Sequence, residues 1–150
     1  MGGLRYHDRK RLCYFIDKGN AENFFEQLSH LNEFVKQEWS EQGNQFELYE
    51  KIGPRVLVIL DNASYHKRQD IIEKIEQALP NIQLCFLPAY SPDFNLIELV
   101  WHACKEFIAH RLFQSVEQLK ELLKSLLNDG ELVISWNRKV RNKGDKIVAT

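Results

Sequence analysis

The sequence predicts an α/β fold, and three observations support this class. Two short apolar runs, at residues 56–60 and 82–87, have the length and composition of strands. Amphipathic segments of helical periodicity lie before, between and after them, and such alternation is typical of strands joined by right-handed crossovers. The length of 150 residues and the apolar content of 44% fit one domain with a hydrophobic core.

The N-terminal third predicts a hairpin followed by a helix. Residues 4–7 and 12–16 flank a polar turn at 8–11, a pattern that favours two antiparallel strands. Asn20 is a suitable cap for a helix whose apolar positions recur at helical spacing, namely Phe24, Leu28, Leu31 and Val35. The polar segment 40–53 ends at Gly53-Pro54, which breaks the chain before the next element.

The remaining elements alternate. Residues 56–60 form a continuous run of β-branched residues and leucine, which predicts a central parallel strand covered on both faces. A helix from Ile71 to Leu79 and a second buried strand at 82–87 follow it. Two more helices are expected, from Asn95 to Ile108 and from Val116 to Leu126, the last closed by Asp129-Gly130. The predicted order is β-β-α-β-α-β-α-α.

The charge is uneven although the net value is only −1. Residues 136–150 contain five cations and one acid, Asp145, so this end permits contact with phosphate. Cys13, Cys85 and Cys104 are far apart, which favours free thiols over a disulfide framework or a zinc site. The apolar runs are too short to span a bilayer, and no signal peptide is recognisable, so we expect a soluble cytoplasmic protein without membrane partners.

Two carboxylates stand where chemistry is plausible. Asp61 follows the strand at 56–60, at the edge where α/β sheets place ligand groups, although Asp61-Asn62 also suits a simple turn. Glu98 follows Asn95 at the spacing of a capping box, which is compatible with a second role in catalysis. Oxygen ligands of this kind suit Mg²⁺, and a pair of such ions can assist phosphoryl transfer.

Other polar side chains near these carboxylates are candidates for supporting roles. His66, His102, Asn62 and Asn95 could orient the metal-binding groups, while Lys67, Arg68 and Lys105 could hold DNA phosphates. Each of them can also be read as an ordinary satisfied or solvated side chain.

The segments LDNASYH at 60–66 and LPAYSPDFNLIE at 87–98, with Trp101 and Lys105, closely resemble the DDE superfamily endonuclease domain. The similarity is strongest to mariner-related transposases of bacterial insertion sequences, and the flanking elements agree loosely from Gly2 to about Leu127. The resemblance implies a ribonuclease-H-like mixed sheet flanked by helices, and cut-and-paste DNA transposition. It also implies that Asp61 and Glu98 are the second and third catalytic carboxylates, acting with Mg²⁺ or Mn²⁺.

The sequence departs from the family pattern in two ways. Leu96 replaces a proline at the first position of a helix, where proline is favoured but not required. The first catalytic aspartate of the family lies on a strand ahead of the hairpin, so we expect this chain to lack that strand. Asp8 falls in the hairpin turn, and Asp17, at the end of the second hairpin strand, is only a weak substitute. Without the strand, backbone groups at 56–60 would be unsatisfied and stability would be marginal.

We therefore interpret residues 1–130 as a partial DDE catalytic domain and 131–150 as a basic tail. The leading hypothesis is a transposase catalytic fragment, inactive alone, that acts on transposon-end DNA. Its expected partners are an upstream reading-frame product carrying the first aspartate and a second copy of the chain. A non-catalytic binding module or a decayed remnant that regulates transposition is the alternative, and a metal-dependent nuclease of another kind is a third hypothesis.

Overall fold

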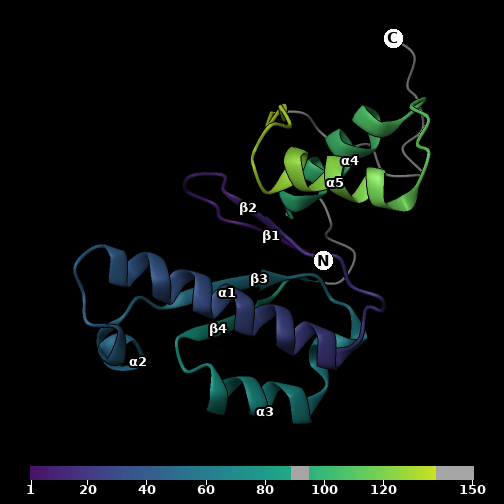
Figure 1. Ribbon diagram of the computed structural model, residues 1–150. Helices are drawn as coiled ribbons and strands as arrows, with labels where there is room; N and C mark the ends of the chain where they lie inside the picture. Colours follow the sequence, from purple (N-terminus) through teal and green to yellow (C-terminus); the bar gives the residue numbers. More distant parts are fainter. Residues whose placement is uncertain (89–94, 138–150) are drawn as a thin grey trace. The chain divides into compact units, whose positions relative to one another are not determined.

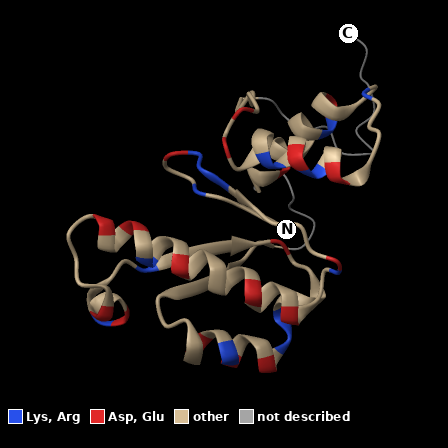
Figure 2. Cartoon of the chain, in the orientation of Figure 1, with Lys and Arg blue, Asp and Glu red and all other residues tan. Residues whose placement is uncertain are grey.

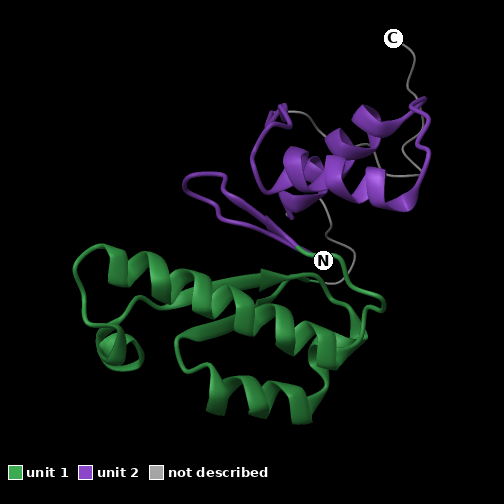
Figure 3. Cartoon of the chain, viewed as in Figure 1, with its two compact units in different colours: residues 1, 14–91 green, residues 2–13, 92–150 purple. Residues whose placement is uncertain are grey.

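A computed structural model describes residues 1–88 and 95–137. The chain divides into two compact units, each with its own core. Unit 1 comprises Met1 and residues 14–91, and unit 2 comprises residues 2–13 and 92–150 (Figure 3). Ala89 to Phe94 of the second motif, and the basic run from Arg138 to Lys146, lie outside the described residues.

Unit 1 is built on a pair of parallel strands. Strand β3 (Val56–Leu60) pairs with β4 (Ile82–Phe86) in register, Val56 opposite Ile82 and Leu60 opposite Phe86. The crossover between them contains the short 3₁₀ helix η2 (Ser64–Lys67) and helix α3 (Gln69–Ala78). Figure 1 shows α3 beside the two strands. The strand–helix–strand unit predicted from the sequence is thus confirmed, with parallel strands as expected.

Helix α1 (Ala21–Glu41) begins where the sequence predicts it. The side chain of Asn20 accepts a hydrogen bond from the backbone N–H of Asn23 at 2.8 Å, so it satisfies one of the free donors of the first turn. Beyond α1, the segment for which no element was predicted holds the 3₁₀ helix η1 (Phe46–Leu48) and the short helix α2 (Tyr49–Ile52).

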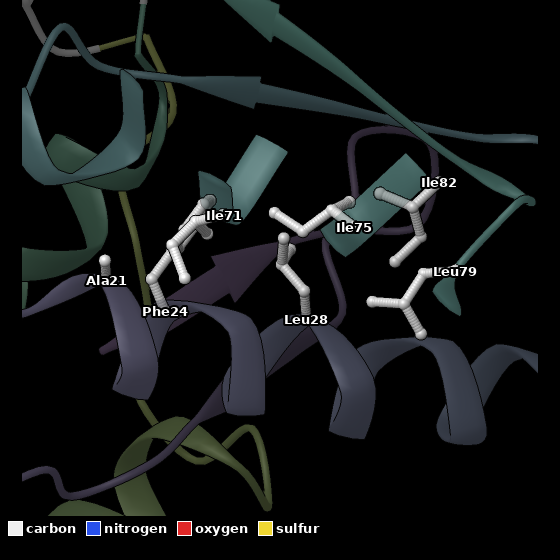
Figure 4. Packing of buried hydrophobic residues seen from close by; sticks show 7 residues of the cluster. All are labelled: Ala21, Phe24, Leu28, Ile71, Ile75, Leu79 and Ile82. Carbon is white, nitrogen blue, oxygen red and sulfur yellow. The ribbon is translucent and has the colours of Figure 1, made fainter. Parts of the chain in front are cut away.

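The core of unit 1 lies between the two helices and one face of the strand pair. Alternate strand residues turn to this face, and Val56, Val58, Leu60 and Leu84 pack on the buried cluster. Figure 4 shows the buried cluster itself, whose members are Ala21, Phe24, Leu28, Ile71, Ile75, Leu79 and Ile82. Burial of these side chains on a shared face fixes how α1 and α3 lie against β3 and β4.

The opposite face of the strand pair corrects one prediction. Leu57 and Ile59 are 58% and 53% exposed, and Gln83 and Cys85 beside them are also exposed. The expectation that the strand at 56–60 is covered on both faces is therefore wrong, and the strand at 82–86, predicted to be buried, is exposed on the same face. The reason is physical: a run of β-branched residues records the preference for a strand, but it does not record how many layers pack on it.

Strand β3 also has an unpaired edge. The N–H of Val56 donates to the carbonyl of Asn81 and the carbonyl of Leu60 accepts from Leu87, so these two residues face β4. Backbone groups alternate along a strand, which turns the N–H and C=O of Leu57 and Ile59 to the other edge. In the described part of the chain no strand pairs with that edge.

Unit 2 begins with the predicted hairpin, in which β1 (Gly2–Leu4) pairs antiparallel with β2 (Arg11–Cys13). Both strands end three residues earlier than predicted. For β1 the reason is the turn, in which Asp8 accepts hydrogen bonds from the Lys10 N–H and the Arg5 side chain. Asp17 consequently lies beyond β2 and does not end a strand, contrary to expectation.

The side chain of Asn128 fixes the outer edge of this hairpin. Its Oδ1 accepts from the Cys13 N–H at 2.7 Å, and its Nδ2 donates to the Cys13 carbonyl at 2.9 Å. Asn128 directly follows α5, so these two bonds tie the end of a helix to the backbone of β2.

Two helices complete unit 2. Helix α4 (Ile97–Ile108) starts two residues later than predicted, and α5 (Val116–Leu127) is capped by Ser115, whose hydroxyl accepts from the Gln118 N–H at 3.1 Å. The buried cluster of this unit consists of Val100, Cys104, Leu126, Leu127 and Leu132. Ordered packing therefore continues past residue 130. None of the helices in the described ranges has the length and apolar character of a membrane span.

Candidate functional site

Asp61 directly follows β3, as predicted, and its side chain is 61% exposed. Its Oδ1 accepts a hydrogen bond from the Ala63 N–H at 3.3 Å, which is the local turn that the Asp61-Asn62 sequence favours. No bond of Oδ2 to a described residue is present, so one carboxylate oxygen faces outward while the other is held by the backbone.

His66 is the closest side-chain neighbour of that carboxylate. Its Nδ1 lies 3.0 Å from Asp61 Oδ1, although off the line of a good hydrogen bond, and the ring is only 8% exposed. The ring centroid lies 4.4 Å from that of Phe24 on α1 and 4.3 Å from that of Tyr65. The histidine is thus fixed by core packing, and it presents a nitrogen to the exposed acid.

Tyr65 is a neighbour of this site that the sequence reasoning missed. Burial raises the pKa of its hydroxyl, and the negative charge of Asp61 raises it further. A Cβ on Gly19 would lie 3.6 Å from the tyrosine oxygen, so the loop before α1 passes close to it. The only sequence signal was its place between Asp61 and His66 in the first motif.

The two cations after His66 differ in what they contact. Lys67 is exposed, with Nζ 5.7 Å from the Phe86 ring centroid, and it has no carboxylate partner within the described ranges. Arg68 pairs with Asp70 at 2.7 Å and with Glu22 at 3.0 Å. Hydrogen bonding to Arg68 lowers the pKa of Asp70 to about 2, and the same pairing raises that of Arg68. Lys67 is therefore the more available cation for a phosphate.

Glu98 lies in the first turn of α4 and is exposed. Asn95 holds this turn, because its Oδ1 accepts from the Ile97 N–H at 3.4 Å and its carbonyl accepts from the Glu98 N–H at 3.0 Å. The reciprocal bond of a capping box, from the Asn95 N–H to the Glu98 carboxylate, is absent among the described contacts. The Glu98 carboxylate is accordingly not engaged in capping.

Farther along α4, His102 is half-buried and Lys105 is exposed. His102 Nε2 lies 3.3 Å from Oε1 of Glu106, so its nearest acid is the one four residues later, not Glu98 four residues earlier. Lys105 is exposed and forms no ion pair with any residue that the structure describes.

The predicted residues thus fall into two groups, each described on its own unit. Unit 1 holds Asp61, the exposed Asn62, His66, Lys67 and Arg68, and unit 2 holds Asn95, Glu98, His102 and Lys105. Within the described ranges no group of three or more His, Cys, Asp or Glu side chains is gathered. The carboxylates of Asp61 and Glu98, each exposed on its own unit, are oxygen ligands of the kind that a hard divalent cation favours.

Comparison with known proteins places this arrangement in a family. A model of the DDE superfamily endonuclease family matches residues 1–120. The catalytic domain of Mos1 mariner transposase superimposes with a TM-score of 0.58 and 23% identity, covering 78% of this chain and 54% of that one. A structure of the Mos1 transposase catalytic domain and raltegravir with Mg gives 0.57 and 24%, covering 74% and 51%. No curated protein matches the sequence.

The chain spans about half the length of these solved transposase domains. Their likeness shows the predicted ribonuclease-H-like fold, a mixed α/β arrangement with small sheets and packed helices. The family model covers most of the sequence, including Asp61 and Glu98. The chain belongs to the DDE superfamily endonuclease family.

Proposed function

We propose that this chain is the C-terminal catalytic portion of a mariner-like transposase, acting in metal-dependent DNA strand cleavage and strand transfer. One observation carries the proposal: in a chain of the DDE family, Asp61 presents an exposed carboxylate at the end of β3, with one oxygen held by the Ala63 N–H and lying 3.0 Å from Nδ1 of His66. Parallel sheets place ligand groups at this position.

Asp61 and Glu98 are the proposed ligands of Mg²⁺ or Mn²⁺. When bound, such ions supply Lewis-acid stabilisation to the charge that develops on a reacting phosphate. Ala63 and His66 orient Asp61, and Asn95 sets the start of α4 that displays Glu98. Lys67 and Lys105, which are exposed, are the proposed contacts to DNA phosphates.

The other predicted residues take smaller parts in this proposal. The guanidinium of Arg68 forms ion pairs with Asp70 and Glu22, and these stabilise the turn into α3. Arg68 contacts DNA only if the ion pairs open. Asn62, which is exposed beside Asp61, and His102, which lies near Glu106, complete the polar surroundings of the two carboxylates.

A separate polypeptide segment is proposed to complete the site. The backbone groups of Leu57 and Ile59 face an edge that no described strand occupies, which suits the addition of a strand that carries the first aspartate. We propose that an upstream reading-frame product supplies it, that the chain alone is inactive, and that a second copy joins the assembly in the cytoplasm.

The test is cleavage of transposon-end DNA in Mg²⁺ or Mn²⁺, with and without the upstream segment supplied in trans. Cleavage is expected only with both pieces, and Asp61→Asn or Glu98→Gln should abolish it. Asp61→Asn retains an oxygen for the Ala63 N–H, so the turn should survive. Glu117→Gln is the matched control for Glu98→Gln, because Glu117 occupies the same position in the first turn of α5. Cleavage that persists in both carboxylate variants would refute the assignment.

The open edge of β3 also favours a second candidate, a non-catalytic module that pairs with transposase and dampens transposition. This function should tolerate both Asp61→Asn and Glu98→Gln, since it uses the strand edge and not the carboxylates. Inhibition of an active transposase by the double variant, without any cleavage by the wild-type mixture, would favour this candidate over the first.

A further inference from the structure

The turn of the hairpin in unit 2 is rich in cations, and these differ in whether they have an acidic partner. Figure 2 shows basic positions of this hairpin turn in blue beside an acidic position in red. Arg5 binds Asp8 with side-chain hydrogen bonds at 2.9, 3.0 and 2.6 Å, and these hold the pKa of the Asp8 carboxyl far below its usual range. The Asp8 carboxylate is thus paired with Arg5, and it forms no ion pair with Arg9 or Arg11 in the part of the chain that the structure describes.

Arg9 is held in a fixed but unsatisfied position. Its backbone has φ of +61°, which is uncommon for a residue with a side chain, and this conformation forms the turn. Its guanidinium carbon lies 4.7 Å from the Tyr6 ring centroid and 4.9 Å from that of Trp136. The Nη1 atom is buried and has no hydrogen-bond partner among the described residues. Two aromatic rings thus orient a cation that still has donors to offer.

Arg11 is a second cation without an acid. It is only 8% exposed, and its Nη1 donates to the Leu132 carbonyl at 2.9 Å. A Cβ added to Gly130 would lie 3.4 Å from Nη2 of Arg11. The absence of a side chain at Gly130 therefore leaves space beside the guanidinium. No carboxylate of a described residue pairs with Arg11, and burial lowers the pKa of its guanidinium. A buried cation of this kind gains from a nearby anion.

Both arginines line one depression of about 540 Å³, which is confined to unit 2. Its walls come from the hairpin turn, the end of α5 and the segment up to Trp136. Two acids are among the lining residues: Asp8, which Arg5 neutralises, and Asp129, which forms no ion pair with either arginine within the described ranges. The depression therefore offers guanidinium donors in excess over free carboxylates.

We propose that this depression binds backbone phosphates of DNA through Arg9 and Arg11. The planar fork of a guanidinium matches two phosphate oxygens, and aromatic rings that hold it in place reduce the entropy lost on binding. The basic sequence at 138–146 begins two residues after Trp136, which extends the same charge along the chain. The choice of DNA as the ligand rests on the proposed function. The site adds a DNA contact to the residues predicted from the sequence, which are Lys67, Arg68 and Lys105.

Binding of a fluorescent duplex, followed by anisotropy over about 50 to 200 mM salt, tests this site through the slope of log affinity against log salt concentration. The variant is Arg9→Gly, because glycine adopts positive φ readily and the turn is retained. The control is Arg111→Ala, which removes the same charge from a guanidinium 4.1 Å from the Phe107 ring, outside the depression. Arg11→Met is the second variant, since it preserves much of the buried stem.

Each arginine in the depression should contribute about one released counterion, so Arg9→Gly should reduce the slope by about one while Arg111→Ala leaves it unchanged. The change should be the same on duplexes of unrelated sequence, because phosphate contacts do not read bases. Equal slopes for Arg9→Gly, Arg11→Met and the control would overturn the site. Since binding is measured without cleavage, a chain that binds DNA but gives no cleavage even with the upstream segment added would count against the proposed function and not against this inference.

Discussion

Nδ1 of His66 lies 3.0 Å from Oδ1 of Asp61, and the two side chains differ sharply in exposure, at 8% and 61%. The imidazole packs against Phe24 from α1 and against Tyr65, so a carboxylate at the surface lies beside a ring that is held in the core. In the proposed function Asp61 is a metal ligand and His66 orients it, and groups with that role commonly affect metal affinity.

Replacing His66 with phenylalanine should separate orientation from packing. The new ring keeps its aromatic neighbours but has no nitrogen for Asp61, so the Mn²⁺ concentration for half-maximal cleavage should rise by about 10- to 100-fold. The assay uses the chain with its upstream segment, and excess Mn²⁺ should restore much of the rate. The thermal midpoint should change little.

His30→Phe is the control for this prediction. His30 also stacks on an aromatic ring, that of Tyr14 at 5.3 Å, and its Nε2 lies 3.8 Å from a carboxylate oxygen of Glu26. It should leave the Mn²⁺ dependence unaltered. An unchanged Mn²⁺ dependence in His66→Phe would show that the histidine only fills the core.

Hydrogen exchange should reveal the open edge of β3. The amides of Leu57 and Ile59 face this edge and should exchange quickly, whereas those of Val56, Val58 and Leu60 face β4 and should be protected. Addition of the upstream segment should slow exchange at Leu57 and Ile59 selectively. A binding partner that stabilises the native state should also raise the thermal midpoint, and the midpoint should rise further, roughly with the logarithm of the partner's concentration. Uniform protection along β3 in the isolated chain would contradict an open edge.

Asp70 should titrate well below an ordinary aspartate. Its pKa in the folded chain is about 2, against a usual value of 3.8, because it accepts hydrogen bonds from Arg68. A depressed pKa stabilises the fold above the unfolded value, so this contribution should be lost as the pH falls from about 4 to 2. The side-chain carbon shift in NMR measures it directly.

Arg68→Gln should return the pKa of Asp70 towards its usual value. Asp8 has a different partner, Arg5, and its pKa should stay far below the usual range in the same variant. If Asp70 titrates identically with and without Arg68, the ion pair does not persist in solution.

The two helix caps should report on the two units separately. Asn20→Ala and Ser115→Ala each remove a bond to an N-terminal amide, of α1 in unit 1 and of α5 in unit 2, and each should cost about 1 kcal/mol. Urea unfolding followed at Trp39 in unit 1 and at Trp101 in unit 2 measures both. If the units unfold independently, each variant should shift only its own tryptophan signal. A shift of both signals by either variant would mean that the chain unfolds as one cooperative body.

Local patterns predicted much of this fold. The strand cores at 56–60 and 82–86 follow from continuous apolar runs, and the start of α1 follows from Asn20, because caps and periodicity are properties of neighbouring residues. The position of Asp61 at the end of β3 was also predictable, since it depends only on where the apolar run stops.

Contacts between distant segments were not predictable in the same way. Helical spacing allows His102 to meet an acid either four residues earlier or four later, and the structure selects Glu106. Arg68 meets Glu22, which is on α1, and His66 is fixed by Phe24 from the same helix. The exposure of Leu57 and Ile59 likewise depends on which layers pack on β3, which no local run of residues records.

The two bonds from Asn128 to Cys13 also bear on self-association. A side-chain amide that satisfies both the N–H and the C=O of a strand residue takes the place of a neighbouring strand, so β2 is blocked at that point. Within the described residues the hairpin keeps β1 as its available edge. Fibre growth by stacked hairpins requires two open edges in every copy, so this hairpin can at most join one other copy, edge to edge, and then stop.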